Sequence, residues 1–432
     1  MNLDSFLSFK QQSDQGNRRP AWVWRFAVVV MLVTTIPYFL GYFSQGDSWH
    51  FTGFVFGVED GNSYIAKMLR GASGDWLFRT PYTALPQRGV LAFLPYLLLG
   101  KLTAPPGQHI ELVVMFHYSR VGAGVLAIVA SYDFLCMFVE KARWRRWGLL
   151  LASLGGGLGW VLVLLGQGDW LGSLPLDFYS PETFGFLALY GLPHLALARA
   201  LLLWGLRAYL RPDLIPHPRW AGWITGALWL LMGLMQPLTI LIGWAVIGSY
   251  LILLLGVQLW GRWKEGHADW ESWFPWLWRT IQAGLVSAPL VGYTAWAFGT
   301  DPVLKQWTAQ NLLPSPPPGH YLVAYGLLLP AAFIVVWQLI KAGPSFRWLL
   351  VSWSFLFPVL IYIPFPFQRR LAEGYWVALI ALVIIALEMV PERVSKRLQG
   401  LLALTLPTTL LLFVGGVQVA RQPAKPVFRP TE

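Results

Sequence analysis

Two adjacent carboxylic acids, Glu59 and Asp60, lie at the start of the longest polar stretch that precedes the C-terminal tail, residues 57–88. The rest of the chain is mostly apolar, so these acids are expected beside a membrane surface. A carboxylate in such a place can accept a proton from a hydroxyl group and act as a general base. The alternative is that both acids only solvate a loop and cap a short helix that starts near Asn62, because acidic residues are common at helix N-termini.

Two adjacent arginines are the second candidate, within the segment PFPFQRRLAE at 364–373. This short aromatic segment is expected to place Gln368, Arg369 and Arg370 at the outer membrane face. The positive-inside rule disfavours paired arginines on that side, so an anionic group should hold them. A lipid phosphate or the loop carboxylates would serve, because guanidinium groups bind both well. Plain contact with lipid headgroups is the alternative.

Membrane helices must position these groups. The chain has 432 residues, of which 56% are hydrophobic and 12% are charged, whereas a soluble domain carries about 25% charged residues. Its apolar residues form blocks of roughly 17 to 28, the length that crosses a bilayer core. The 25 Trp and 16 Tyr suit membrane interfaces. The sequence therefore predicts an all-α polytopic membrane protein.

Composition also limits the chemistry. We assign the net charge of +11 to the positive-inside bias and expect no nucleic-acid partner. The single cysteine, Cys136, excludes an intrachain disulfide and a cysteine-rich metal site. The sequence has no nucleotide-binding GxxxxGK[ST], no HExxH and no GxSxG motif. A divalent metal on Glu59 or Asp60 stays open, although two adjacent carboxylates do not make a convincing site alone.

The distribution of Lys and Arg sets the orientation. Residues 1–21 should be cytoplasmic, and residues 44–110 should form a first outer loop with juxtamembrane helices. The apolar patch at 89–104 is short and contains Pro95, so it should lie at the outer interface. If it crossed, the basic run at 141–146 would face outward. About eleven spans result, with the N-terminus inside and the tail at 420–432 outside, in a single integral membrane domain over 1–432. The spans are expected at about 22–43, 111–139, 147–166, 183–210, 220–235, 238–260, 278–298, 321–340, 346–363, 374–390 and 398–419.

Ionisable residues inside spans are costly unless they are paired or hydrated. Asp133 and Arg199 are expected at matching depths near the inner ends of their spans, where they should pair across neighbouring helices. His117 and Arg120 share one helix face and serve either to help hold an anionic ligand or as a structural pair. His194 is either a core histidine or a ligand-binding one. The glycine run at 155–159 is expected to allow close helix packing within a span.

In its layout the chain resembles the GT-C membrane glycosyltransferases. A cytoplasmic start and one span lead to an outer loop with an acidic pair, followed by short juxtamembrane helices and a run of further spans. The resemblance is strongest to the branch that contains protein O-mannosyltransferases and lipid A aminoarabinose transferases. The patterns EDGNSYIAKMLRGASGDW, SPETFGFLALYGLPH and PFQRRLAEG are also similar to those of a group of bacterial membrane proteins placed in this superfamily.

The resemblance implies a GT-C-like fold and an inverting glycosyltransferase in a bacterial plasma membrane. The donor would be a polyprenyl-phosphate sugar reached from the outer face, with an acceptor that the sequence does not identify. Asp60, helped by Glu59, would take the place of the loop acid and deprotonate the acceptor. Arg369 and Arg370, with Arg120, would stabilise the phosphate.

The aromatic residues Tyr64, Trp76 and Tyr82 would either stack on a sugar or anchor the loop at the interface. A transporter or flippase for a lipid-linked or anionic solute is the alternative function, and a non-catalytic scaffold is a third. Transporters place binding charges near the bilayer midplane, often within inverted repeats. Here the unpaired charges gather at the outer face and no repeat is visible, which favours the enzyme.

Overall fold

The computed structural model describes residues 19–431 as a bundle of helices with one small sheet. The first half contains α2 (Ala21–Ser44), β1 (Trp49–Phe51), α3 (Val58–Ala72), α4 (Leu94–Lys101), α5 (His109–Phe138), α6 (Ala142–Leu154), α7 (Gly159–Leu164), α8 (Leu176–Tyr179), α9 (Phe186–Gly191), α10 (Pro193–Leu210), η1 (Pro212–Leu214) and η2 (Pro218–Trp220). The second half contains α11 (Ala221–Met235), α12 (Pro237–Glu265), α13 (Trp270–Thr300), α14 (Pro302–Gln310), α15 (Pro318–Tyr325), α16 (Leu329–Ala342), α17 (Trp348–Tyr362), η3 (Gln368–Ala372), α18 (Tyr375–Met389), α19 (Glu392–Leu402), η4 (Ala403–Thr405), α20 (Pro407–Arg421) and β2 (Phe428–Pro430).

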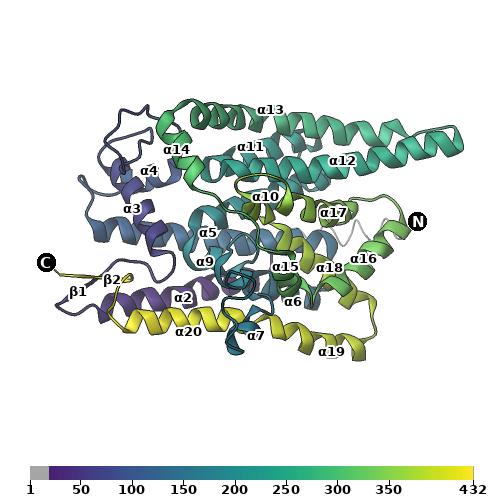
Figure 1. Cartoon of the computed structure of the whole chain (residues 1–432). Coiled ribbons are helices and arrows are strands. Elements are labelled where there is room, and N and C mark those ends of the chain that lie inside the picture. The colour runs from purple at the N-terminus through teal and green to yellow at the C-terminus, as the bar shows by residue number, and fades with distance from the viewer. Residues whose placement is uncertain (1–18, 432) are drawn as a thin grey trace.

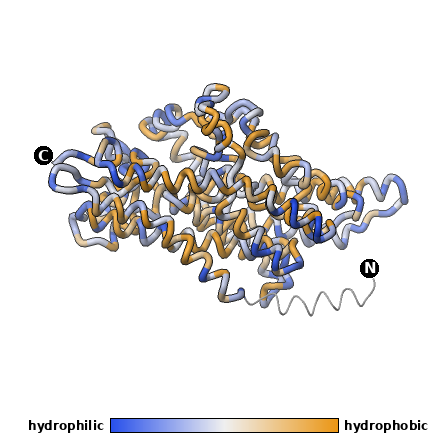
Figure 2. Tube along the Cα trace, turned by 90° about the horizontal axis from the view of Figure 1, so that it is seen from below, coloured by the Kyte–Doolittle hydropathy of each residue, from blue (hydrophilic) through white to orange (hydrophobic). Residues whose placement is uncertain are grey.

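The long helices run along one common axis, with polar caps at both ends. In Figure 1, α2, α5, α11, α12, α13 and α20 extend across the molecule, α3 and α4 cover the left end, and the turn between α12 and α13 projects at the right. Figure 2 shows hydrophobic residues along the middle and hydrophilic ones gathered at the two ends. This is the distribution that a bilayer core between two aqueous faces requires.

Five helices of the described residues are long and apolar enough to cross a membrane, or up to six if one bent pair counts as a span. They begin at Ala21, His109, Pro237, Gln368 and Glu392, and the bent pair joins α15 to α16 at 85°. Nearly every predicted apolar block coincides with a helix, but several helices are short or interrupted. The count of about eleven spans stays a prediction.

Glycine and proline account for several interruptions. The block at 147–166 divides into α6 and α7 at the glycine run, because the chain there approaches neighbouring backbone instead of continuing as a helix. The backbone N–H of Gly156 donates to the Thr405 carbonyl, and that of Leu158 donates to the Val323 carbonyl. The glycines were expected inside a span, and they form its break. The block at 183–210 divides at Pro193, the first residue of α10.

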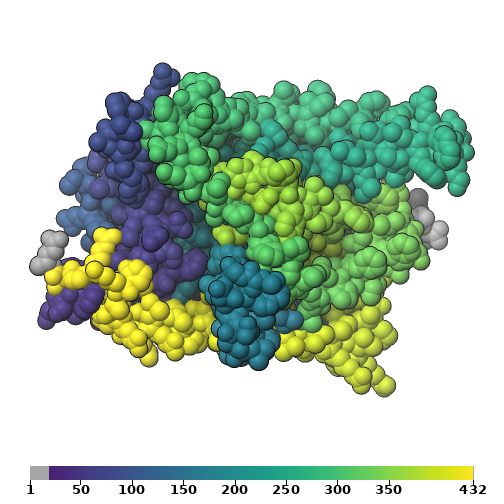
Figure 3. Space-filling view, viewed as in Figure 1, coloured from purple at the N-terminus to yellow at the C-terminus, as the bar shows by residue number. Residues whose placement is uncertain are grey.

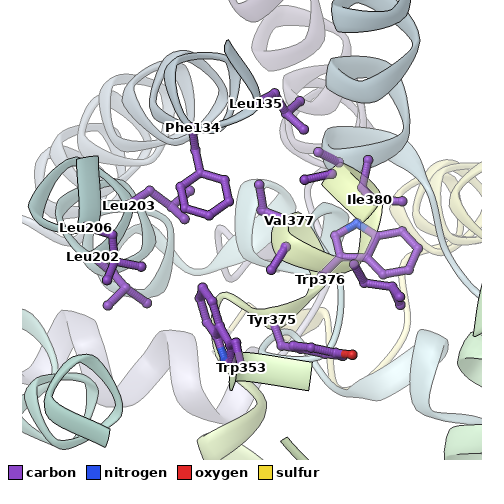
Figure 4. Packing of buried hydrophobic residues seen from close by; sticks show 14 of the residues in the cluster. Phe134, Leu135, Leu202, Leu203, Leu206, Trp353, Tyr375, Trp376, Val377 and Ile380 are labelled. Atoms are coloured by element: carbon purple, nitrogen blue, oxygen red, sulfur yellow. The ribbon is translucent and has the colours of Figure 1, made fainter. Parts of the chain in front are cut away.

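The packing centre is α18, whose residues are buried on nearly every side. Figure 4 shows Trp353 near the leucines of α10 and Phe134, while Trp376 points to the opposite side of α18, near Ile380. Such a helix is apolar all round because no side of it meets solvent or a polar neighbour. This core holds α5, α10, α17 and α18 in fixed relative positions.

The two sheet strands join the segment after α2 to the C-terminal end of the described chain. Strand β2 pairs antiparallel with β1, with Phe51 opposite Phe428, and the Thr52 hydroxyl donates to the Val427 carbonyl at 2.8 Å. The side chains of Val427 and Phe428 are buried against α3 and α5. The C-terminal tail and residues 44–110 therefore lie on the same side of the bundle, and their outer location stays a prediction.

The predicted pairing of Asp133 with Arg199 is wrong. Asp133 instead accepts two hydrogen bonds from Arg19 Nε and one from Arg19 Nη2, the shortest at 2.8 Å, and one from Trp204 at 2.8 Å. Arg199 lies in the second turn of α10, because Pro193 shortens the helix, and it pairs with the buried Glu373 at 2.5 Å. Each charge thus has a partner at its own end of the bundle.

We predict that Arg199→Met destabilises the protein strongly, because Glu373 would remain buried without its counter-charge. Removing one partner of a buried pair costs about 3–5 kcal/mol. Thermal unfolding in detergent should show a large decrease in the midpoint, and the double variant Arg199→Met/Glu373→Gln should recover part of it.

Arg143→Met is the matched control, since Arg143 pairs with Glu392 where both side chains are exposed. Such pairs contribute about 0–1 kcal/mol. Equal unfolding midpoints for Arg199→Met and Arg143→Met would contradict the assignment of Arg199 as a buried structural cation.

Candidate functional site

Helix α3 places the adjacent acids Glu59 and Asp60. Gly57 precedes it with a φ of +59°, a left-handed conformation that glycine adopts without strain. The helix therefore begins at Val58, earlier than expected, and Glu59 and Asp60 lie in its first turn. No side-chain hydrogen bond caps the helix, so neither carboxylate is used as a cap.

Helix α3 is fixed by a close crossing with α4. A Cβ atom added to Gly71 would collide with the backbone of Leu97, and one added to Gly100 would collide with the backbone of Met68. The two glycines thus let the helix backbones touch. This contact fixes the position of α3, and with it that of Asp60, relative to α4.

The Asp60 carboxylate has no hydrogen bond or ion pair within residues 19–431. Its side chain is exposed, yet enough protein surrounds it that desolvation raises its pKa above the ordinary value. Arg370 and then Lys67 act in the opposite direction, whereas Glu59 and Glu182 raise the pKa further. These interactions place α3, the segment before α9 and η3 around one carboxylate.

The segment η3 is fastened to the proline-rich connection between α14 and α15. The backbone of Leu313 donates to the Pro366 carbonyl at 2.8 Å and accepts from the Arg369 N–H at 3.2 Å. The Gln368 Oε1 accepts from the Ser315 N–H at 3.1 Å, and its Nε2 donates to a backbone carbonyl at 2.7 Å. Both ends of the Gln368 amide are thus engaged by the chain itself.

The two arginines of η3 diverge. Arg370 Nε lies 3.7 Å from Glu182 Oε1, and Arg370 is the arginine of the pair that acts on Asp60. The Arg369 guanidinium lies 4.7 Å from the centre of the Tyr179 ring, and its Nε is buried without a hydrogen-bond partner in the described chain. The expected arginine pair therefore presents two separate cations.

Arg199 holds the surroundings of Arg370 in place. Its guanidinium donates to the Phe184 carbonyl at 2.9 Å and to the Pro181 carbonyl at 2.8 Å, while it pairs with Glu373. Glu182, 4% exposed, lies between these two carbonyl groups in the sequence. One buried arginine thus connects the acid that faces Arg370 to the end of η3.

A third cation, Lys67, lies on α3 two turns after Asp60. It is 4% exposed, and its ammonium donates to the Ser63 hydroxyl at 2.5 Å. The aromatic rings of Phe93, Tyr64 and Trp307 lie within 6 Å of it, with Phe93 the nearest at 4.6 Å. Burial lowers the pKa of Lys67 to about 8, and the negative charge of Asp60 limits this decrease.

Tyr64 contributes to an aromatic wall. Its ring stacks on Tyr96 at 4.7 Å and on Phe116 at 5.9 Å, nearly parallel to both. The Tyr96 hydroxyl is hydrogen-bonded to His194 Nδ1 at 2.8 Å. Tyr64 and His194 therefore belong to one packed cluster beside Asp60.

His117 and Arg120 lie deeper, in the core between α2, α5 and α9. Arg120 is fully buried and donates to His117, to the Thr34 and Thr35 hydroxyls and to carbonyls at the end of α9. His117 bonds the Gly53 carbonyl at 2.9 Å. These contacts are those expected if His117 and Arg120 form a structural pair. Their role in holding an anionic ligand stays a prediction.

Trp76 lies apart from this cluster. It is 65% exposed, and Lys101 Nζ lies 4.3 Å above its ring. Tyr82 is similarly exposed. Neither has a contact in the described chain that joins it to Asp60 or Arg370, so stacking of Trp76 or Tyr82 on a sugar stays a prediction beside interface anchoring.

The surface between these elements is hollowed. On the face shown in Figure 3, a depression separates the purple first outer loop from the green and yellow-green segments that include 311–318 and η3. Within residues 19–431 no group of three or more His, Cys, Asp or Glu side chains is placed to hold a metal ion.

Sequence reasoning missed Lys67 and did not include Glu182 among the site residues. The signal for Lys67 was its spacing of seven from Asp60, which puts both on one face of a helix. For Glu182 the pattern SPETFGFLALYGLPH contained the residue, but its contact with Arg370 depends on tertiary packing.

Comparisons with known proteins indicate the fold. No family model and no curated protein matches the chain. Two solved structures of the oligosaccharyltransferase from Archaeoglobus fulgidus are similar in fold. The apo form has a TM-score of 0.54 and 13% sequence identity, and the match covers 92% of this chain and 56% of that one. A complex with Zn and sulfate has a TM-score of 0.53 and 14% sequence identity, and the match covers 93% of this chain and 53% of that one. The chain thus spans little more than half the length of these structures. The likeness agrees with the expected GT-C-like architecture; the specific branch stays a prediction.

We predict that Gly71→Ala disturbs the site by separating α3 from α4. Overpacking of a tight contact costs about 1–3 kcal/mol, so the thermal unfolding midpoint should decrease. Gly122→Ala is the control, because a Cβ at Gly122 in α5 meets open space and alanine favours a helix by up to about 1 kcal/mol. A Gly71→Ala protein as stable as Gly122→Ala would contradict the close crossing.

Proposed function

We propose that the protein is an inverting membrane glycosyltransferase that moves a sugar from a polyprenyl-phosphate donor to an acceptor on the outer face of the membrane. The observation that carries the proposal is the Asp60 carboxylate, which is unpartnered within the described chain and lies within electrostatic range of Arg370. The fold likeness to an oligosaccharyltransferase supports it.

Asp60 acts as the general base. The acceptor hydroxyl attacks C1 of the sugar, the bond from C1 to the phosphate oxygen breaks, and the hydroxyl proton passes to Asp60. The lipid phosphate leaves with the bonding electrons, so it needs little help from an acid. A carboxylate suits this role because it accepts the proton late, as the new bond forms. The raised pKa of Asp60 makes it a stronger base than an ordinary aspartate.

Arg370 stabilises the charge that grows on the leaving phosphate. Its guanidinium lies only 3.7 Å from Glu182, but that separation leaves room for a phosphate oxygen to compete for its hydrogen bonds. Arg369 has a buried Nε without a partner in the described chain, which supports a second contact to the lipid-linked donor. Preorganised cations of this kind lower the barrier because they are already oriented before the reaction.

A divalent metal does not fit the residues around Asp60. The solved complex of the archaeal enzyme holds Zn and sulfate, but no set of three potential ligands exists in residues 19–431 of this chain. The surroundings of Asp60 contain two cations, Arg370 and Lys67, beside two further acids, Glu59 and Glu182. The cations can stabilise negative charge on a phosphate without a metal ion. No step of the proposed reaction uses a metal.

The setting follows from the same proposal. The protein lies in a bacterial plasma membrane with the N-terminus in the cytoplasm and the C-terminal tail outside, together with the first outer loop. The pairing of β2 with β1 supports the common side of loop and tail. Transport is less well supported, because Asp60 and Arg370 meet at one end of the bundle and not along a central path.

We predict that Asp60→Asn lowers glycosyl transfer by about a hundredfold or more, because the amide cannot accept the proton. Reconstituted protein and a labelled polyprenyl-phosphate sugar provide the assay. Wild-type activity should decrease as the pH falls through the raised pKa of Asp60, since only the deprotonated carboxylate acts as a base.

Glu59→Gln is the matched control, one residue away in the same helical turn. It should retain most of the activity. Equal turnover by wild type and Asp60→Asn would remove Asp60 as the base, and passage of the intact donor across the membrane without transfer of its sugar would favour the transporter.

A further inference from the structure

Lys67 is a buried cation without a counter-ion. Its ammonium donates to the hydroxyl and the carbonyl oxygen of Ser63, at 2.5 and 3.3 Å. No carboxylate of residues 19–431 lies within ion-pair distance of it. Burial of an ammonium without an opposite charge is costly. Such a residue is expected to have a function that offsets the cost.

Two other buried cations of the bundle show the difference. Arg199 is neutralised by Glu373 and donates to two carbonyl groups. Arg120 has no carboxylate either, but Nε, Nη1 and Nη2 all donate to the chain. Lys67 has three N–H donors and a single residue, Ser63, as their partner. It therefore keeps both its charge and a donor for a further group.

The aromatic surroundings explain how the charge is tolerated. Phe93 from the start of α4, Tyr64 from α3 and Trp307 from α14 surround the ammonium at 4.6, 5.3 and 5.9 Å. The negative faces of aromatic rings stabilise a cation without neutralising it. A lysine held in this way still exerts an attractive potential on an incoming anion.

Lys67 and Arg370 act on the same carboxylate from different elements. Both lower the pKa of Asp60, so both lie within electrostatic range of it. Asp60 forms no ion pair with either. Lys67 has no ion pair within residues 19–431, and Arg370 has only the 3.7 Å contact with Glu182, so both keep donors for an anion beside Asp60.

We propose that Lys67 is an anion-binding residue of this site, and that it and Arg370 together hold the phosphoryl group of the lipid-linked donor. This inference rests on the proposed function and deepens it. When the donor binds, the ammonium donates its remaining N–H to a phosphoryl oxygen, and Asp60 stays free to accept the proton of the acceptor.

The titration of Lys67 supports a sharp test. Its pKa of about 8 means that its charge is lost between about pH 7 and pH 9, whereas a phosphodiester keeps one negative charge throughout this range. From α14 the contact is Trp307, which does not titrate. Other titratable groups lie around Lys67 and its neighbour Asp60. They are Asp60 and Tyr64 on α3, Tyr96 on α4, His194 on α10, Glu182 before α9 and Arg370 in η3.

The experiment measures binding of a short-chain polyprenyl-phosphate hexose to the purified full-length protein by titration calorimetry. Wild-type affinity should decrease about tenfold from pH 7 to pH 9, as the protonated fraction of Lys67 falls. Lys67→Arg should bind with no such decrease, because arginine stays charged. Lys67→Met should bind roughly ten- to a hundredfold more weakly at pH 7.

Lys101→Met is the matched control. Lys101 belongs to the same outer loop and also lies over an aromatic ring, that of Trp76, but it is not buried. The Lys101→Met protein should bind the polyprenyl-phosphate hexose with the affinity of wild type. If Lys67→Met fails to fold, as judged by its thermal unfolding, the comparison of wild type with Lys67→Arg across pH decides alone.

The outcomes separate the two proposals. Equal affinity of wild type and folded Lys67→Met, or the same pH profile for wild type and Lys67→Arg, overturns the role of Lys67 and leaves the glycosyltransferase intact. Weak binding by Lys67→Met without sugar transfer by wild type supports the anion site and overturns the transferase. Absence of binding by wild type at pH 7 overturns both.

Discussion

The candidate site depends on the buried ion pair between Arg199 and Glu373. Arg199 reaches from α10 to two carbonyl groups of the segment before α9 and to the residue that follows η3. It thereby fixes Glu182 and Arg370 relative to the packed core of α10 and α18. A pair in this position contributes specificity of arrangement more than net stability, because desolvation of both charges offsets much of their attraction. Together with the contact between Arg370 and Glu182, it joins η3 to the segment before α9.

The cations of the protein fall into two kinds. Arg19, Arg199 and Arg120 are saturated by carboxylates, hydroxyls or carbonyl groups, and they hold helices together. Lys67 and Arg370 both act on Asp60 and have incomplete partners. Saturated charges stabilise one packing arrangement, whereas incompletely satisfied ones provide binding energy to a ligand.

Much of the fold could be predicted from the sequence, because apolar blocks of bilayer length form helices almost wherever they occur. The start of α3 and the breaks at Pro193 and at the glycine run depended on local backbone chemistry and were placed less well. The candidate acids were identified since they were polar residues in an apolar chain. The partners of Asp133 and Arg199 were not, because depth along a helix does not specify which neighbour packs against it. Lys67 was missed because a lysine in a polar loop looks solvated until the aromatic rings from α4 and α14 are known to cover it.

The strand pair of β1 and β2 has a consequence for biosynthesis. The side chains of Val427 and Phe428 pack in one buried cluster with Phe54 and Ile65 of the first outer loop. A membrane protein is inserted from its N-terminus onward, so the loop emerges early, while the strand that completes its core arrives only after α20 has been placed. The acidic helix α3 therefore acquires its final support late, and a partly synthesised chain would carry its carboxylates on an unfinished scaffold.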